Sequence, residues 1–169
     1  MRLGPCSLLP TVVAALILAA GCRESAAGPS EIRATAELVG AWTSPRNALA
    51  PQTSHQTTLT FTIDGRFILE SRTWGLYEGQ SPGTLSTITR TEGRYLVRGD
   101  RIELDPQRLR WWDSLDGPES PSRFEESEAR GPMFEDARFT VNEDRLSIRY
   151  TIAPRDTPIG LRGVYVRIR

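Results

Sequence analysis

The chain has 169 residues, and its formal net charge is zero because 21 basic residues balance 21 acidic ones. Hydrophobic residues make up 38% and charged residues 25%, which excludes a disordered tail and a polytopic membrane protein. The balanced charge argues against nucleic acid as a partner, since such binding needs a clustered basic face. Every basic residue is an arginine. The absence of lysine excludes Schiff-base chemistry and a P-loop.

The first 21 residues have the features of a signal peptide. Arg2 precedes an apolar run from Leu8 to Ala20, which is shorter than the ~17–25 residues needed to span a bilayer. The stretch LAAGC, which ends at Cys22, resembles the lipobox of bacterial lipoproteins. That resemblance implies cleavage before Cys22 and attachment of lipid to it. An ordinary secretory leader with an incidental cysteine is the alternative.

The cysteine count favours lipidation. The sequence contains only Cys6, inside the leader, and Cys22, so the mature chain has no disulfide and no thiol nucleophile. Several acyl chains would anchor the protein stably in a membrane, where one gives only marginal binding. By resemblance to lipoproteins of two-membrane cells, Arg23 favours the outer membrane. We therefore expect a cell-envelope protein with a lipidated cysteine and flexible tether over 22–37 and one domain over 38–169.

From residue 38 onward the hydrophobic pattern has a period of two, which predicts β-strands. Asp64-Gly65, Gly99-Asp100 and the segment 142–144 are turn signals between alternating segments, and they predict antiparallel hairpins. The pattern indicates an all-β domain, an antiparallel up-and-down meander barrel of about eight to ten strands. The expected strands are 39–44, 56–63, 66–73, 84–91, 93–98, 101–104, 107–113, 136–141, 145–152 and 162–168. One strand over 101–113, bent at Pro106, is the alternative to the two separate pieces there.

The same alternation predicts which side chains point inward. In the last strand we expect Val164, Val166 and Ile168 to face the core, with Tyr165 and Arg167 facing out. The other residues expected to point inward are Leu59, Phe61, Ile63, Phe67, Leu69, Tyr95, Val97, Ile102, Leu104, Phe139, Val141, Leu146, Ile148 and Tyr150. Two long loops are expected, at 45–55 and 114–135. The second is rich in proline and acidic residues and is expected to be the least ordered part of the domain.

Gly40-Ala41-Trp42 opens the first predicted strand and resembles the G-x-W signature of lipocalin-like (calycin) barrels. The resemblance implies that a large loop, here 45–55, lies over the open end of the barrel. It also implies that an arginine near the end of the last strand packs across Trp42. Arg167 is preferred for this role, and Arg169 is the alternative. The 114–135 segment departs from a minimal barrel of this family.

The sequence offers little for catalysis, and we predict no catalytic residue, metal or cofactor. His55 is the only histidine and is expected in a loop, without the partner and orienting group that a general base needs. One histidine without a thiol makes a zinc site unpromising. Glu125, Glu126 and Glu128 lie in the acidic loop and are expected to be solvated. Glu70, Glu78, Glu92 and Glu103 show no visible pairing of the kind that glycosidases use.

Four aromatic residues are candidates for a ligand or partner surface. Trp74 and Tyr77 flank Gly75 at the end of a strand, and Trp111 and Trp112 are adjacent and therefore face opposite sides. The simpler alternative is that one tryptophan lies in the core and the other under a loop.

We expect a non-enzymatic, lipid-anchored barrel that binds or senses a small apolar or amphipathic ligand. The alternatives are an envelope protein-interaction module with a packed barrel and no cavity, and a carboxylate-dependent envelope hydrolase.

Overall fold

The computed structural model describes residues 36–129, 133–152 and 159–169. The predicted signal peptide, Cys22 and almost all of the predicted tether lie outside the described residues. None of the helices within the described ranges is long and apolar enough to cross a membrane.

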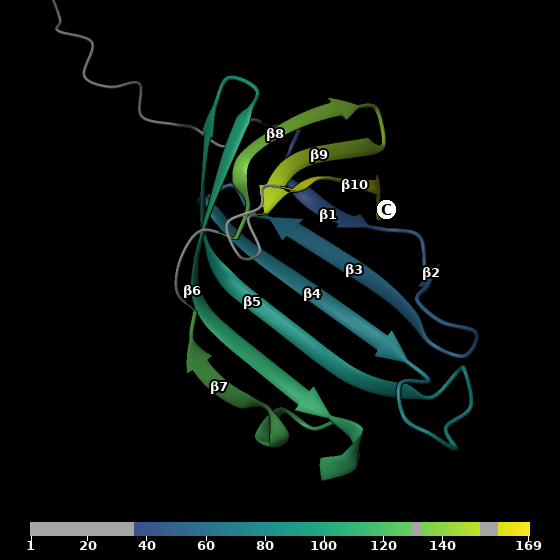
Figure 1. The fold of residues 1–169 in the computed structure, drawn as a ribbon. Helices are drawn as coiled ribbons and strands as arrows, with labels where there is room; N and C mark the ends of the chain where they lie inside the picture. The colour runs from purple at the N-terminus through teal and green to yellow at the C-terminus, as the bar shows by residue number, and fades with distance from the viewer. Residues whose placement is uncertain (1–35, 130–132, 153–158) are drawn as a thin grey trace, which may run out of the picture. The chain divides into compact units, whose positions relative to one another are not determined.

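The domain is all-β, as predicted, and consists of one sheet of ten strands with two short 3₁₀ turns, η1 and η2 (Figure 1). Its elements are β1 (Gly40–Thr43), β2 (Asn47–Ala48), β3 (Ser54–Phe61), β4 (Arg66–Trp74), β5 (Leu85–Arg98), β6 (Arg101–Asp113), η1 (Ser114–Asp116), η2 (Pro121–Arg123), β7 (Glu125–Glu128), β8 (Glu135–Asn142), β9 (Arg145–Ile152) and β10 (Ile159–Arg167).

The strands form an antiparallel meander that closes on itself. The sheet order is β1-β10-β9-β8-β6-β5-β4-β3-β2, and β1 also pairs with β3, so the first strand joins the two ends. The turns at 64–65, 99–100 and 143–144 connect antiparallel neighbours, as the sequence predicts. Closure of this kind removes the unpaired edges of β1, β3 and β10 where these strands meet.

Two pairs of predicted strands are continuous, and two strands, β2 and β7, were not predicted. Segments 84–91 and 93–98 form the single strand β5, and 101–104 and 107–113 form β6. The register between β5 and β6 shifts between Glu92 and Gly93. At this point the two strands pass from the closed part of the sheet into its open extension. Within the expected 114–135 loop lie η1, η2 and β7, which pairs with β6. Its sequence, EESE, has no apolar residue, so alternation could not reveal it.

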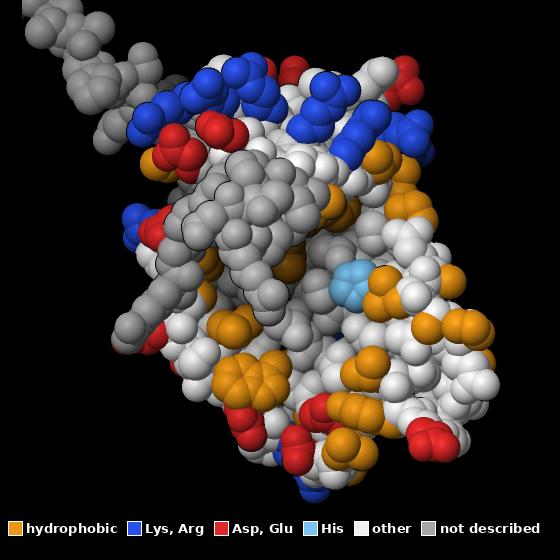
Figure 2. Space-filling model, viewed as in Figure 1, with side chains coloured by type: hydrophobic (Ala, Val, Ile, Leu, Met, Phe, Trp, Pro, Cys, Tyr) orange, Lys and Arg blue, Asp and Glu red, His pale blue; other side chains and the backbone are white. Residues whose placement is uncertain are grey.

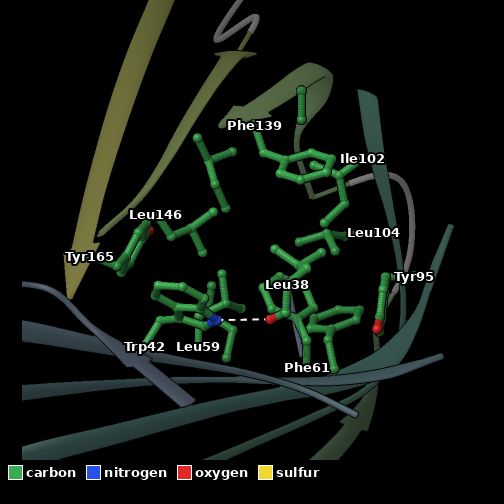
Figure 3. Close-up of a cluster of buried hydrophobic side chains, with 14 of the residues drawn as sticks. Leu38, Trp42, Leu59, Phe61, Tyr95, Ile102, Leu104, Phe139, Leu146 and Tyr165 are labelled. Atoms are coloured by element: carbon green, nitrogen blue, oxygen red, sulfur yellow. Dashed lines mark hydrogen bonds between the residues drawn. The ribbon is translucent and has the colours of Figure 1, made fainter. Parts of the chain in front are cut away.

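The core fills the space inside the closed part of the sheet (Figure 3). Leu38, Trp42, Leu59, Phe61 and Phe67 are at most 1% exposed. Phe61 and Tyr95 meet edge to face with their ring centroids 4.9 Å apart. Most of the residues expected to point inward are members of this core or pack against it.

Two predictions of side-chain direction are wrong. Ile63 is 72% exposed because β3 ends at Phe61 and the chain then turns, with Thr62 N bonded to Arg66 O at 2.9 Å. In β10 the faces are reversed: Tyr165 is buried, and Val166 and Ile168 are about half exposed. The inner face of this strand carries the large aromatic side chain of Tyr165. Burying that side chain contributes more to stability than burying the two aliphatic side chains would.

Trp42 and Arg167 join the first and last strands, as predicted. The two residues are register partners, and the Arg167 guanidinium carbon lies 4.1 Å from the centroid of the Trp42 ring. Arg167 Nη1 donates to Val39 O (2.8 Å) and Nη2 to Glu37 O (2.7 Å). Trp42 Nε1 donates to Leu38 O at 2.8 Å. Because Arg167 shares the inner side of β10 with Tyr165, the guanidinium reaches Trp42 directly and does not curl around the rim.

The long strands continue past the closed part as an open sheet. We use "closed end" for the part around Trp42 and the core. We use "open sheet" for β2, residues 54–57 of β3, 71–74 of β4, 85–91 of β5 and 108–113 of β6, and β7. There β2 covers one edge of β3, and β7 covers one edge of β6. The 45–55 segment, expected over the open end, instead contains β2 and runs beside β3.

Candidate functional site

The inner face of the open sheet is lined with hydroxyl groups. Thr57 pairs with Ser71, and Ser71 pairs with Thr89, so these three side chains lie on one side of three adjacent strands. His55, Thr73 and Thr87 form a second row of cross-strand partners beside the first. We call these six residues, three from each row, the hydroxyl face. They lie on the side of the sheet that carries Leu59 and Leu69 at the closed end.

His55 is part of a hydrogen-bonded chain on this face. Its Nε2 lies 3.0 Å from Thr57 Oγ1, and its Nδ1 lies 3.5 Å from Thr73 Oγ1. Thr57 Oγ1 in turn lies 3.5 Å from Ser71 Oγ. The imidazole is partly buried, and burial lowers the pKa of His55 below its ordinary value. A neutral imidazole has one donor and one acceptor, so it can bond hydroxyl groups on both sides.

The histidine is accessible from the inner side of the domain. Figure 2 shows the single His side chain, in pale blue, at the margin of a hollow in the surface. All six residues of the hydroxyl face are partly exposed, whereas their strand neighbours Leu59 and Phe67 are fully buried. The hydroxyl face is therefore a half-buried polar surface continuous with the apolar core.

Apolar groups flank the hydroxyl face on β6. Trp111 pairs with Thr89, and Leu109 pairs with Thr91, and both pairs lie on the inner side. Thr91, opposite Leu69 on β4, is buried and marks the boundary with the core. The face thus has a hydroxyl-rich centre, an imidazole on the β3 side and an indole on the β6 side. Such a surface can bind a molecule that has both polar and apolar parts.

The aromatic residues singled out from the sequence do not form one surface. Trp74 ends β4 and is stacked by Arg46, whose guanidinium carbon lies 4.1 Å from the ring centroid. Tyr77 donates a hydrogen bond to the carboxylate of Asp113, and this bond raises the pKa of Tyr77 to about 12. Trp74 therefore lies at the end of β4 and Tyr77 in the turn that follows, and each has its own partner.

Trp111 and Trp112 face opposite sides, as predicted. Trp112 pairs with Ile88 on the outer side, and both are at least 96% buried. Its Nε1 has no hydrogen-bond partner among the described residues. Trp111 is partly exposed on the inner side. Of the four aromatic candidates, Trp111 alone adjoins the hydroxyl face.

The carboxylates of β4 and β5 belong to ion pairs on the outer side. Glu70 lies between Arg72 (2.8 Å) and Arg90; burial alone would raise the pKa of Glu70, but hydrogen bonds from Arg90 and Arg72 lower it. Glu92 pairs with Arg110. Among the described residues no group of three or more histidine, cysteine, aspartate or glutamate side chains could hold a metal ion.

The hydroxyl face was not predicted, although the sequence contains a signal for it. His55 was expected in a loop but lies in β3, so its direction could not be assigned. Extending the alternation of Leu59 and Phe61 backward reaches Thr57 and His55, and extending that of Leu69 forward reaches Ser71 and Thr73. The inward positions thus change from apolar to hydroxyl-bearing along the same strands. The length of each strand decides this change, and the ends of an element are what a sequence specifies least well.

Comparison with known proteins adds little. No family model matches the chain, and no curated protein sequence does. Among solved structures, the crystal structure of Rv2717c from M. tuberculosis matches with 18% identity and a TM-score of 0.32, covering 79% of this chain and 94% of that chain. A match of this quality carries no information about function.

Proposed function

We propose that the protein is a lipid-anchored envelope protein that binds a small amphipathic ligand on the hydroxyl face. The observation that carries this proposal is the row of partly exposed hydroxyls and His55 inside a sheet whose other half holds the buried apolar core. The polar part of the ligand would bond the hydroxyls and the imidazole. Its apolar part would contact Trp111 and Leu109.

The choice of residues supports a binding role over a purely structural one. Threonine is well suited to a β-strand, but a leucine at the same inward position would bury more apolar surface. A partly desolvated hydroxyl offers orientation and specificity to a ligand, since a few placed polar groups on an apolar wall are typical of small-molecule sites. The packed closed end leaves the open sheet as the place for the ligand.

A matched pair of threonine substitutions tests the binding site. The probe is 11-(dansylamino)undecanoic acid, an amphipathic fluorophore, titrated against the full chain in detergent. Thr89→Val removes one hydroxyl from the hydroxyl face with little change in shape, and Thr60→Val removes one from the outer side of β3. We expect Thr89→Val to weaken binding by about three- to tenfold, as loss of one hydrogen bond implies, and Thr60→Val to leave it unchanged.

Two results would contradict the binding proposal. If the wild-type chain does not bind the probe, the interaction-module alternative from the sequence becomes the better description. If Thr60→Val weakens binding as much as Thr89→Val, the probe binds elsewhere. Far-UV circular dichroism of both variants would establish that the fold is retained.

The anchor is tested separately at Cys22. We expect Cys22→Ser to move the protein from the membrane fraction to the soluble fraction, because the acyl chains would be lost. Cys6→Ser, inside the predicted leader, is the control and should leave the protein in the membrane fraction. A Cys22→Ser protein that stays with the membrane would overturn the lipid anchor without affecting the binding site.

A further inference from the structure

Five arginines form a row across the outer side of the closed end. Each is the direct cross-strand partner of the next: Arg98 on β5, Arg101 on β6, Arg138 on β8, Arg149 on β9 and Arg162 on β10. All five side chains are exposed. Figure 2 shows blue arginine side chains gathered along the top of the view, above β8 and β9. We call these five residues the arginine row.

Like charges placed directly opposite each other destabilise a sheet. Two of the five have an acidic partner, Arg138 with Asp100 at 2.8 Å and Arg98 with Glu103 at 3.6 Å. Arg162 Nε donates to Ser147 Oγ at 2.9 Å. No described acidic side chain lies within ion-pair distance of Arg101 or Arg149. Among the described residues, this row therefore carries more positive charge than its ion-pair partners neutralise.

The part of the row on β8, β9 and β10 borders two surface hollows. One, of about 320 Å³, is lined by Arg138, Arg149 and Arg162 together with the hydroxyls of Thr140 and Ser147; Asp100 also lines it. The other, of about 360 Å³, is lined by the same three arginines and by Asp136. Three arginine side chains therefore border both hollows, and two hydroxyl-bearing residues border the first. Each hollow is large enough for a compact anion.

We propose that Arg138, Arg149 and Arg162 form a binding site for a phosphate ester group. Guanidinium binds phosphate through two parallel hydrogen bonds, which lysine cannot reproduce, and every cation of this chain is an arginine. The neighbouring hydroxyls of Thr140 and Ser147 can donate to the remaining phosphate oxygens. The phosphate is carried by a lipid headgroup or by a small soluble ester. This site lies on the opposite side of the sheet from the hydroxyl face and does not depend on the proposed ligand.

A second copy of the chain is a weaker candidate for this surface. Its acidic segment would be β7, but Glu126 is paired with Arg108 at 3.1 Å, and Glu128 also has a partner. These carboxylates would have to leave existing partners before they could reach the arginine row. A phosphate group has no such competing contact.

The experiment uses the full chain in zwitterionic detergent micelles and calorimetric titration in two arms. One arm adds micelles that carry phosphatidic acid, and the other adds soluble glycerol 3-phosphate. Arg149→Gln and Arg162→Gln are compared with Arg66→Gln, an exposed arginine of β4 that is paired with Asp64 at 3.2 Å. We expect the wild type to bind in at least one arm. We expect each row variant to weaken that binding by about tenfold, as loss of a charge-assisted bond implies, and Arg66→Gln to leave it unchanged.

Binding in the first arm alone identifies a lipid headgroup, and binding in the second identifies a soluble ester; either supports the site. Arg149→Lys keeps the charge but loses the paired bonds, so we expect intermediate affinity. The proposal is overturned if neither probe binds, or if Arg66→Gln reduces binding as much as Arg149→Gln. It is also overturned if the only effect of Arg149→Gln is the loss of a concentration-dependent dimer in analytical ultracentrifugation.

Discussion

The closed end and the open sheet share four long strands but have opposite inner surfaces. On β3, Leu59 and Phe61 are at most 1% exposed, whereas His55 and Thr57, earlier on the same strand, are partly exposed and hydrogen-bonded to hydroxyls. The same change occurs on β4 between Leu69 and Ser71. Apolar burial is the dominant source of folding stability. We infer that the closed end supplies most of that stability and leaves the open sheet free to carry polar groups.

Truncation of Trp42 has the largest expected effect on stability and tests this division of roles between the closed end and the open sheet. The side chain is completely buried, its Nε1 is bonded to Leu38 O, and Arg167 covers its ring. We expect Trp42→Ala to lower the free energy of unfolding by about 3–5 kcal/mol, as is usual for a buried tryptophan. Chemical denaturation with urea measures the change. Trp111→Ala in the open sheet should cost much less, and an equal loss in the two variants would contradict the division.

Gly93 tests the junction of the two regions. A Cβ atom at this position would clash with Asp105 O and lie 2.8 Å from Pro106 Cα, so β5 and β6 would have to separate at the bulge. We expect Gly93→Ala to cost about 1–3 kcal/mol of stability, the range for overpacking. Gly83→Ala is the control, because nothing lies within 4 Å of its added Cβ. A neutral Gly93→Ala would mean that the junction can move without cost.

The contact that joins the first and last strands can be measured by a double-mutant cycle. We expect Trp42→Phe and Arg167→Gln to be coupled by about 0.5–2 kcal/mol, the range for a cation–π pair between exposed and desolvated settings. The same cycle with Arg169→Gln should give no coupling, because Arg169 is 84% exposed and paired with Asp144. Coupling to Arg169 alone would reverse the assignment of the closing arginine.

The closed end was more predictable than the open sheet for a physical reason. Its strands bury one face completely, so alternation of large apolar residues specifies both strand and direction, as at Leu146 and Ile148. Where burial is partial, the alternation of apolar and polar residues is weaker. β7 has no apolar residue, and β2 is only two residues long. In β10 both faces carry large side chains, so the residue types alone led to the wrong prediction of which face points inward. The pairing of Trp42 with Arg167 was predictable because both residues occupy the strands that must meet for the sheet to close.

The hydroxyl face was accessible from the sequence only with knowledge of strand length. Thr87 and Thr89 belong to a threonine-rich stretch that predicts a strand but gives no clear inner face. Their direction follows from pairing with Thr73 and Ser71, which is a property of the folded sheet. The arginine row depends in the same way on the register between β6, β8, β9 and β10. Sites assembled from single residues of several strands leave no contiguous motif.

The smallest expected effect is the pH dependence that His55 gives to stability. Burial lowers the pKa of His55 in the folded state below its ordinary value of about 6.5, so the folded protein takes up this proton less readily than the unfolded chain. Stability is therefore unaffected by this group well above that pH and falls as the pH decreases from about 6.5 toward the lowered pKa. Urea denaturation at two pH values, one above and one below 6.5, should give a smaller free energy of unfolding at the lower pH for the wild type. His55 is the only histidine, so His55→Gln should remove this loss of stability while retaining a hydrogen-bonding group beside Thr57. If His55→Gln keeps the full loss, the imidazole is not desolvated in the folded protein, and the open sheet is more hydrated than its partial burial implies.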